Sequence, residues 1–162
     1  MKKVISSPKA PGAIGPYSQA VEANGIVFVS GQLPIDAATG MMAGDAETQA
    51  RQSLENIKHI LEEAGLSMAN VVKTTVFLAD MSLFADMNKV YTTYFDGAFP
   101  ARSAVAVKAL PKDALVEIEC IAVREQICNN KTTASYEDEI FREAFLLRGP
   151  YGGRNIGVAG AF

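Results

Sequence analysis

The chain has 162 residues and a formal net charge of −3, with 49% hydrophobic and 20% charged residues. This length suits one ordinary domain with its own core, and no run of about 18 apolar residues predicts a membrane-spanning helix. The acidic balance, with no basic run longer than Lys2-Lys3, argues against nucleic acid as a partner, because phosphate binding needs clustered Lys and Arg.

The first half of the chain predicts a short strand, a hairpin and a helix. Val4 to Ser6 suits a strand, and the Pro- and Gly-rich segment that follows is typical of a loop. Two apolar runs flank Asn24-Gly25, which is the strongest local signal for a hairpin. Asp45 begins a helix with one apolar stripe at spacings of three and four, and Gly65 ends it. The stripe consists of Ala50, Leu54, Ile57, Leu61 and Ala64.

The second half predicts another strand, a second helix and two further strands. Residues 71–78 are rich in Val and Thr, and either Asp80 or Ser82 can cap a helix that runs to about Phe95. Strands are expected over 102–108 and 116–123. The order β-β-β, α, β, α, β-β predicts an α+β fold in which two helices pack on one face of a mixed β-sheet.

The other face of this sheet is expected to need a partner. In the last strand Ile121 and Val123 share that face with Glu117 and Glu119, so the face is too apolar for full exposure to water. We therefore expect self-association to bury it.

The composition changes after Arg124. A first domain is predicted over residues 1–125, and residues 126–162 form a C-terminal extension of unknown role. Within the extension Ser135 is a plausible N-cap for a short helix over 136–147.

Cysteine and histidine are too few for a metal site, and no metal is expected. The chain has one histidine, His59, and two cysteines, Cys120 and Cys128, with no framework around them. Free thiols and a cytoplasmic location are expected, since no long apolar segment follows the first lysines as in a secretory signal.

One arginine stands out in the stretch FPARSAVAVKALP, residues 99–111. Arg102 shares its strand face with Ala104 and Ala106, which leave room beside it, and no acidic residue is adjacent. A guanidinium presents a planar fork that fits a carboxylate. The strand alone supports equally a ligand and a carboxylate of the same protein as the partner of Arg102.

The separation between Arg102 and the acidic residues of the last strand depends on the strand register. If the last two strands form a hairpin, Arg102 lies opposite Ile121, and Glu117 lies four residues along, roughly 13 Å away. That spacing favours an Arg102 available to a ligand, with Glu117 separated from it by substrate and water or contributed by another subunit.

Four segments together resemble the RidA/YjgF family of reactive-intermediate deaminases over residues 1 to about 124. They are GPYSQA at 15–20, FVSGQLP at 28–34, TQARQSLENIK at 48–58, and FPARSAV through VEIECIAV at 99–123. Their order and spacing match the family. A single P-A-R-S would be a weak signal, whereas four segments in register are a strong one.

The resemblance implies a chorismate-mutase-like fold assembled as a homotrimer with active sites between subunits. It also implies an enzyme that hydrolyses the C=N bond of 2-imino acids, such as 2-iminopropanoate and 2-iminobutanoate, to 2-oxo acids and ammonia. These imines arise from enamines released by pyridoxal-phosphate dehydratases. The family uses no cofactor and its partner is the small imino or oxo acid, with no membrane involved.

The resemblance also assigns roles to individual residues. Arg102 would hold the substrate carboxylate and Glu117 would position or activate the attacking water, although a surface carboxylate is the alternative for Glu117. Tyr17 would lie over the pocket, or else pack on the sheet as a loop aromatic. Gly31 would offer a backbone N–H at a place where a Cβ would obstruct the ligand.

Three further positions match less directly. Ser30 and Asn88 match pocket-associated positions, although Asn88 could equally lie on a helix surface. Many relatives carry cysteine where this chain has Ala104, so a reactive thiol is absent there, and the residue can serve through its backbone N–H. Alanine at position 104 is thus one departure from the family. The extension after Arg124 is a second, since relatives commonly end near this point.

Two other functions remain open from sequence. A non-catalytic protein that binds or senses 2-oxo acids needs Arg102, whereas Glu117 is needed chiefly by the enzyme. An action on nucleic acid is also reported within the family, and the acidic balance of this chain argues against it.

Overall fold

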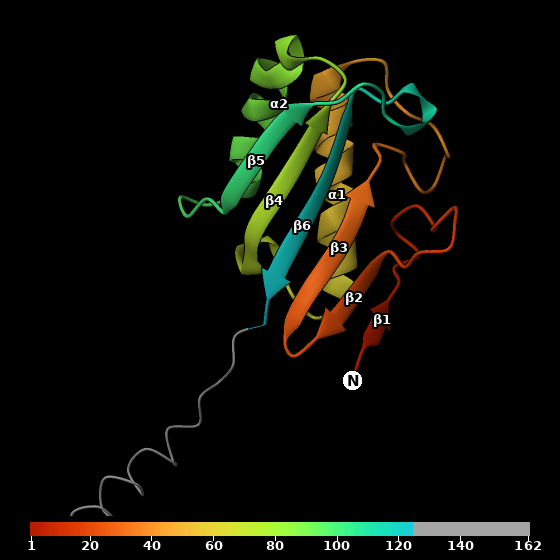
Figure 1. The fold of residues 1–162 in the computed structure, drawn as a ribbon, viewed down its shortest axis with the longest axis vertical. Coiled ribbons are helices and arrows are strands. Elements are labelled where there is room, and N and C mark those ends of the chain that lie inside the picture. Colours follow the sequence, from red (N-terminus) through yellow and green to blue (C-terminus); the bar gives the residue numbers. More distant parts are fainter. Residues whose placement is uncertain (125–162) are drawn as a thin grey trace, which may run out of the picture. The chain divides into compact units, whose positions relative to one another are not determined.

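The computed structural model describes residues 1–124, and these form one six-stranded sheet with two helices (Figure 1). The strands lie in the order β1-β2-β3-β6-β4-β5, so that β1 and β5 are the two edges. Their bounds are β1 Lys3–Ile5, β2 Ala20–Ala23, β3 Ile26–Gln32, β4 Val71–Leu78, β5 Ala101–Ala106 and β6 Val116–Val123. The helices are α1 Ala46–Glu63 and α2 Phe84–Tyr91. The predicted α+β order of elements is therefore confirmed.

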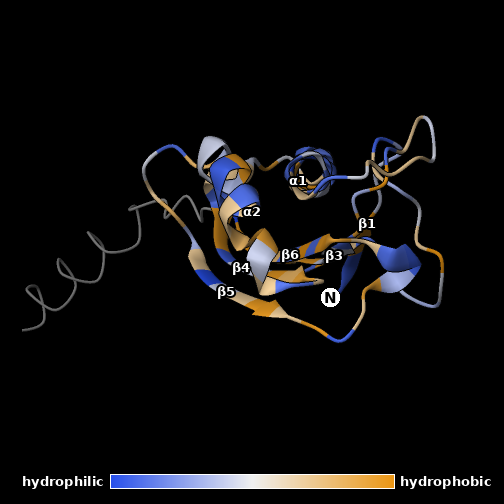
Figure 2. Cartoon of the chain, turned by 90° about the horizontal axis from the view of Figure 1, so that it is seen from above, coloured by the Kyte–Doolittle hydropathy of each residue, from blue (hydrophilic) through white to orange (hydrophobic). Residues whose placement is uncertain are grey.

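Both helices cover the same face of the sheet, as Figure 2 shows. The core between the two layers contains the predicted stripe of α1 and the alternating residues of β6 that face it, among them Leu54, Ile57 and Ile118, all fully buried. Asp45 caps α1 by accepting a hydrogen bond from the backbone N–H of Thr48 at 2.8 Å. Within the described residues, no helix is both long enough and apolar enough to cross a bilayer.

The turns follow the predicted local chemistry. Asn24 and Gly25 join β2 to β3 with φ of 50° and 76°, the left-handed conformation that a two-residue hairpin requires. Of the two candidate caps, Asp80 caps the 3₁₀ turn Met81–Leu83 that leads into α2, because its carboxylate accepts from the N–H of Ser82; α2 itself begins after Leu83 without a side-chain cap. The α-helix then ends at Tyr91, and a 3₁₀ turn over Thr92–Tyr94 completes the segment predicted to run to Phe95.

One strand pairing differs from the sequence prediction. The last two strands do not form a hairpin: β4 lies between them, parallel to β5 and antiparallel to β6. Arg102 is in register with Thr74 of β4 rather than opposite Ile121. The reason is that residues 107–115 cross over the end of β4, so the chain returns on the far side of that strand.

The face of the sheet opposite the helices carries exposed apolar side chains. Phe28, Val105 and Val123 are 47%, 45% and 38% exposed there, beside the half-buried Ile121. No element of residues 1–124 covers this face. The predicted apolar face is therefore present and open.

Arg124 fixes the end of the described body. Its guanidinium donates to both carboxylate oxygens of Glu22, at 3.0 and 3.2 Å, and to the carbonyl oxygen of Ala64 at 2.7 Å. These contacts join the end of β6 to β2 and to the C-terminus of α1. The extension, with its predicted helix over 136–147 and Cys128, lies outside the described residues.

We predict that a chain lacking residues 127–162 folds and keeps its activity. The sheet, both helices, the core and the Arg124 contacts are complete without those residues. The expected melting temperature lies within about 5 °C of that of the full chain, as for a change of no more than about 1 kcal/mol. Thermal unfolding followed by circular dichroism measures this, and an insoluble or inactive truncated chain would show that the extension belongs to the fold or the site.

Candidate functional site

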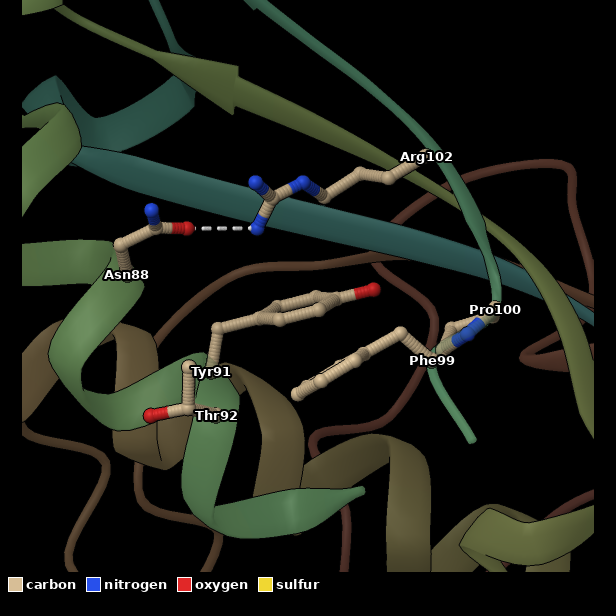
Figure 3. A pocket seen from close by; sticks show the side chains of 6 residues that line it. All are labelled: Asn88, Tyr91, Thr92, Phe99, Pro100 and Arg102. Atoms are coloured by element: carbon tan, nitrogen blue, oxygen red, sulfur yellow. Dashed lines mark hydrogen bonds between the residues drawn. The ribbon is translucent and has the colours of Figure 1, made fainter. Parts of the chain in front are cut away.

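Arg102 lies on the helix-facing side of β5, with its guanidinium against α2 (Figure 3). Nη1 donates to the side-chain oxygen of Asn88 at 2.7 Å. The guanidinium carbon lies 4.5 Å from the ring centroid of Tyr91 and 5.4 Å from that of Phe84. The side chain is thus held by an amide oxygen and two aromatic rings, none of which carries a charge.

The space around this guanidinium is a pocket of about 290 Å³. Its lining consists of Asn88, Tyr91, Thr92, Phe99, Pro100 and Arg102. None of the ion pairs among residues 1–124 includes Arg102. The alternative that Arg102 pairs with a carboxylate of its own chain is therefore not observed in this part of the molecule, and the pocket offers one uncompensated positive charge among apolar and amide groups.

Ala104 follows on the same face of β5, partly buried and packed against the core. Its methyl group leaves no reactive group at this position. Cys120, the one cysteine among residues 1–124, is buried on the helix-facing side of β6, and burial raises its pKa to about 12, so it remains protonated. The described residues therefore offer no nucleophilic thiolate.

Glu117 lies on the opposite face of the sheet. It stands between Val116 and Ile118, both fully buried beneath the helices, so the alternation of β6 directs Glu117 to the open face. Arg102, by contrast, is in register with Thr74, which is buried and hydrogen-bonded to α2. The two candidate catalytic side chains of one chain are therefore separated by the sheet itself.

Gly31 makes room for Glu117. A Cβ built on Gly31 would run into the Glu117 carboxylate, whose Cδ and Cγ lie 3.0 and 3.3 Å from that position. A β-bulge produces this contact, because Ser30 and Gly31 together oppose the single residue Glu119 between the flanking pairs of β3 and β6. The structure thus places a protein carboxylate at the position where the sequence predicted a ligand.

Burial raises the pKa of Glu117, and the negative charge of Glu119 raises it further. Both causes disfavour the charged carboxylate. A half-buried carboxyl group with a raised pKa holds a proton more readily than an ordinary glutamate and can accept and return one, which is the property of a general acid–base group.

The loop that carries Tyr17 is tied to the same bulge. Ser30 donates from its hydroxyl to the carbonyl of Ser18 at 2.7 Å and from its N–H to the carbonyl of Gln19 at 2.9 Å. Tyr17 is half exposed and lines a narrow slot together with Gly31. Tyr17, Ser30, Gly31 and Glu117 therefore form one group, which we call the glutamate group.

Asn88, Arg102, Tyr91 and Phe84 form a second set, the arginine group. Tyr91 is buried in the core, and its ring also faces the guanidinium. The position of Tyr91 three residues after Asn88 on one helix was the available signal, since such residues share a face. Phe84 and Phe99 had no comparable signal.

The chain matches known proteins over the described body. The family model described as Endoribonuclease L-PSP matches residues 7–124. A RutC family protein of Pyrococcus horikoshii is 56% identical over 126 residues, which are 77% of this chain and all of that protein. A 2-iminobutanoate/2-iminopropanoate deaminase of Salmonella typhimurium is 52% identical over 127 residues, 76% of this chain and 99% of that enzyme.

A solved structure agrees in fold as well as in sequence. The crystal structure of Escherichia coli TdcF with bound serine superposes with a TM-score of 0.74 at 49% identity, covering 76% of this chain and 99% of that one. A match of this extent, over the whole sheet and both helices, goes beyond a shared fold class. The chain therefore belongs to the RidA/YjgF family, whose family model bears the description Endoribonuclease L-PSP.

Proposed function

We propose that this chain hydrolyses 2-imino acids, such as 2-iminopropanoate and 2-iminobutanoate, to 2-oxo acids and ammonia. The observation that carries the proposal is the uncompensated guanidinium of Arg102 in a small pocket of neutral groups. A planar carboxylated molecule of a few carbon atoms suits that pocket in size and charge. The name of the Salmonella relative, which is 52% identical, supports the same substrates.

The proposed site is completed between copies of the chain in a homotrimer. The arginine group and the glutamate group lie on opposite faces of one sheet, so a single ligand reaches both only if a second copy supplies one of them. The exposed apolar side chains of the open face, among them Phe28, Val105 and Val123, give such an assembly its contact surface.

In the proposed reaction the protein supplies binding and proton transfer. Arg102 holds the substrate carboxylate through two parallel hydrogen bonds, while Asn88 steadies the guanidinium. Glu117 takes a proton from water as the water oxygen bonds to the imine carbon, and passes it to the imine nitrogen, which gives a carbinolamine. Glu117 then moves the proton of the new hydroxyl group to the nitrogen as the C–N bond breaks, which leaves the 2-oxo acid and ammonia. The backbone N–H groups of Gly31 and Ala104 and the ring of Tyr17 complete the contacts. In this role the protein removes reactive products of pyridoxal-phosphate dehydratases.

A coupled assay tests the proposal. A pyridoxal-phosphate threonine dehydratase generates the imine in situ, and its disappearance is followed with and without this protein, beside calorimetric titration with 2-oxobutanoate. We expect faster imine loss. If 2-oxobutanoate binds but imine loss is never accelerated, the chain is a binding protein for small carboxylates. RNA degradation by the purified chain, without imine turnover, would favour the activity in the family description instead.

We predict that the acid limb of the pH–rate profile lies above the ordinary range for glutamate and responds to Glu119. The pKa of Glu117 is raised, so turnover falls as the pH drops through that raised value and the base becomes protonated. Glu119→Gln removes the second cause of the shift and leaves burial in place. The limb should therefore move to lower pH, as measured by kcat/KM across the acidic range. An unchanged limb would mean that Glu117 is not the group that titrates.

A further inference from the structure

Within residues 1–124, the groups that hold the guanidinium of Arg102 are neutral. Asn88 accepts one hydrogen bond at 2.7 Å, and the Tyr91 and Phe84 rings lie within 4.5 and 5.4 Å of the guanidinium carbon. In Figure 3 the Tyr91 ring extends beneath the guanidinium from the α2 side. Because no carboxylate in residues 1–124 pairs with Arg102, its orientation depends on these three contacts.

Tyr91 is itself fixed at both ends of its side chain. Its residue is only 3% exposed, and its hydroxyl lies 2.7 Å from the hydroxyl of Thr74. Thr74 is 1% exposed on β4 and is in direct register with Arg102 on β5. The Phe95 ring packs on Tyr91 with centroids 4.8 Å apart, and burial raises the pKa of the Tyr91 hydroxyl, which therefore stays protonated.

This arrangement connects the strand that carries Arg102 to the ring that faces its guanidinium. An arginine side chain has several rotatable bonds. To donate two parallel hydrogen bonds to a carboxylate, its guanidinium must lie in one plane and point in one direction. A ring against the guanidinium attracts the cation and restricts that plane. Thr74 and Arg102 are neighbours across β4 and β5. The hydrogen bond between the Thr74 and Tyr91 hydroxyls therefore fixes the position of the Tyr91 ring relative to Arg102.

We propose that Tyr91, held by Thr74, is a positioning residue that fixes the plane of the Arg102 guanidinium, so that the fork is ready for a carboxylate before the ligand arrives. This inference rests on the proposed carboxylate-binding function of Arg102. It assigns to Tyr91 a role in binding and to Thr74 a role in holding Tyr91. Neither residue touches the reacting atoms.

The expected signature is a rise in KM with little change in kcat. Arg102 binds the carboxylate in both the ground state and the transition state. A less well oriented guanidinium therefore weakens the binding of both states equally. For Tyr91→Leu we expect KM for the imine, and Kd for 2-oxobutanoate, to rise roughly 5- to 30-fold, the range of a partly desolvated cation–π contact. Tyr91→Phe keeps the ring, so its KM and Kd should rise far less. Thr74→Val should raise KM and Kd about as much as Tyr91→Phe does.

Phe95→Leu is the matched control. Phe95 is a buried aromatic of the same cluster, 6% exposed, and its ring contacts Tyr91, whereas the rings that face Arg102 are those of Tyr91 and Phe84. A general loss of packing should raise KM equally in Phe95→Leu and Tyr91→Leu. The positioning role requires a clearly larger rise in Tyr91→Leu, which removes the ring that faces Arg102, than in Phe95→Leu, which leaves that ring in place.

A second readout needs no ligand and no activity. In the free protein, ring currents of Tyr91 should shift the NMR signals of the Arg102 Nε–H and Cδ protons, and Tyr91→Leu should remove this shift while Tyr91→Phe keeps it. If the wild type neither binds 2-oxobutanoate nor consumes imine yet shows this shift, the proposed function fails and the geometry stands. The inference is overturned if Tyr91→Leu leaves the Arg102 signals unchanged, or if its KM matches that of Phe95→Leu. If Tyr91→Leu does not fold, the wild-type signals decide: Arg102 Nε–H and Cδ protons that show no ring-current shift overturn the inference.

Discussion

Arg102→Ala is expected to abolish both binding and turnover, whereas Glu117→Gln is expected to abolish turnover and leave the binding of 2-oxobutanoate largely intact. Removing the guanidinium deletes a charge-assisted bidentate contact and leaves the ligand carboxylate desolvated and unpaired, at a cost of about 2–3 kcal/mol or more. Glu117→Gln keeps the shape beside Gly31 but removes the capacity to accept a proton from water. Loss of a general base commonly lowers the rate by ~10²–10⁴.

The imine assay and calorimetry on both variants measure this division of roles. Arg102→Lys is the matched control for charge, because it keeps the cation but loses the planar fork, and we expect binding between those of wild type and Arg102→Ala. Imines also hydrolyse in water unaided, so a loss of this size can reduce the Glu117→Gln rate to the background. Wild-type turnover in Glu117→Gln would refute the water-activating role.

Asn88→Asp should eliminate carboxylate binding by satisfying Arg102 internally. The Asn88 side-chain oxygen already lies 2.7 Å from Nη1, so an aspartate there would form an ion pair with the guanidinium and repel an anionic ligand. Like charges brought together in a partly buried site cost several kcal/mol, which predicts a loss of roughly 100-fold or more in affinity for 2-oxobutanoate.

The comparison that isolates charge is Asn88→Ala. This variant loses the same hydrogen bond to Arg102 without adding a negative charge, and only a several-fold loss is expected, in line with one hydrogen bond to a charged group. Calorimetric titration of both variants with 2-oxobutanoate gives the answer. Equal losses in the two would mean that Asn88 acts only by holding Arg102, and that the net charge of the pocket does not control binding.

Local patterns in the sequence were sufficient to predict the elements of the fold. The stripe of α1, the Asn24-Gly25 turn and the Asp45 cap each depend on residues within a few positions of one another, and the structure has all three. The order of the strands depends on contacts between distant segments. No pattern in residues 102–123 indicated that β4 would lie between the last two strands, so the expected hairpin was wrong.

The candidate site shows the same division. Arg102 stands out in sequence as a large cation on a strand face of alanines, and the structure places it in a pocket where no carboxylate of residues 1–124 pairs with it. The contact of Gly31 with Glu117 arises from a bulge that pairs two residues of β3 with one of β6, and alternation alone cannot locate such a bulge. Sequence alternation also could not tell which face of the sheet each residue occupies. The assumed hairpin placed Arg102 and Glu117 on two paired strands, whereas in the structure they lie on opposite faces of the sheet.

The central claim is that one active site takes Arg102 from one copy of the chain and Glu117 from another. Co-expression of Arg102→Ala with Glu117→Gln chains tests it, with the two variants carrying different affinity tags so that mixed assemblies can be purified. Each variant alone should be inactive, but in every purified mixed trimer about a third of the sites join an intact Arg102 to an intact Glu117, so about a third of wild-type activity should return. Mixed assemblies that are no more active than either variant alone would contradict the shared site.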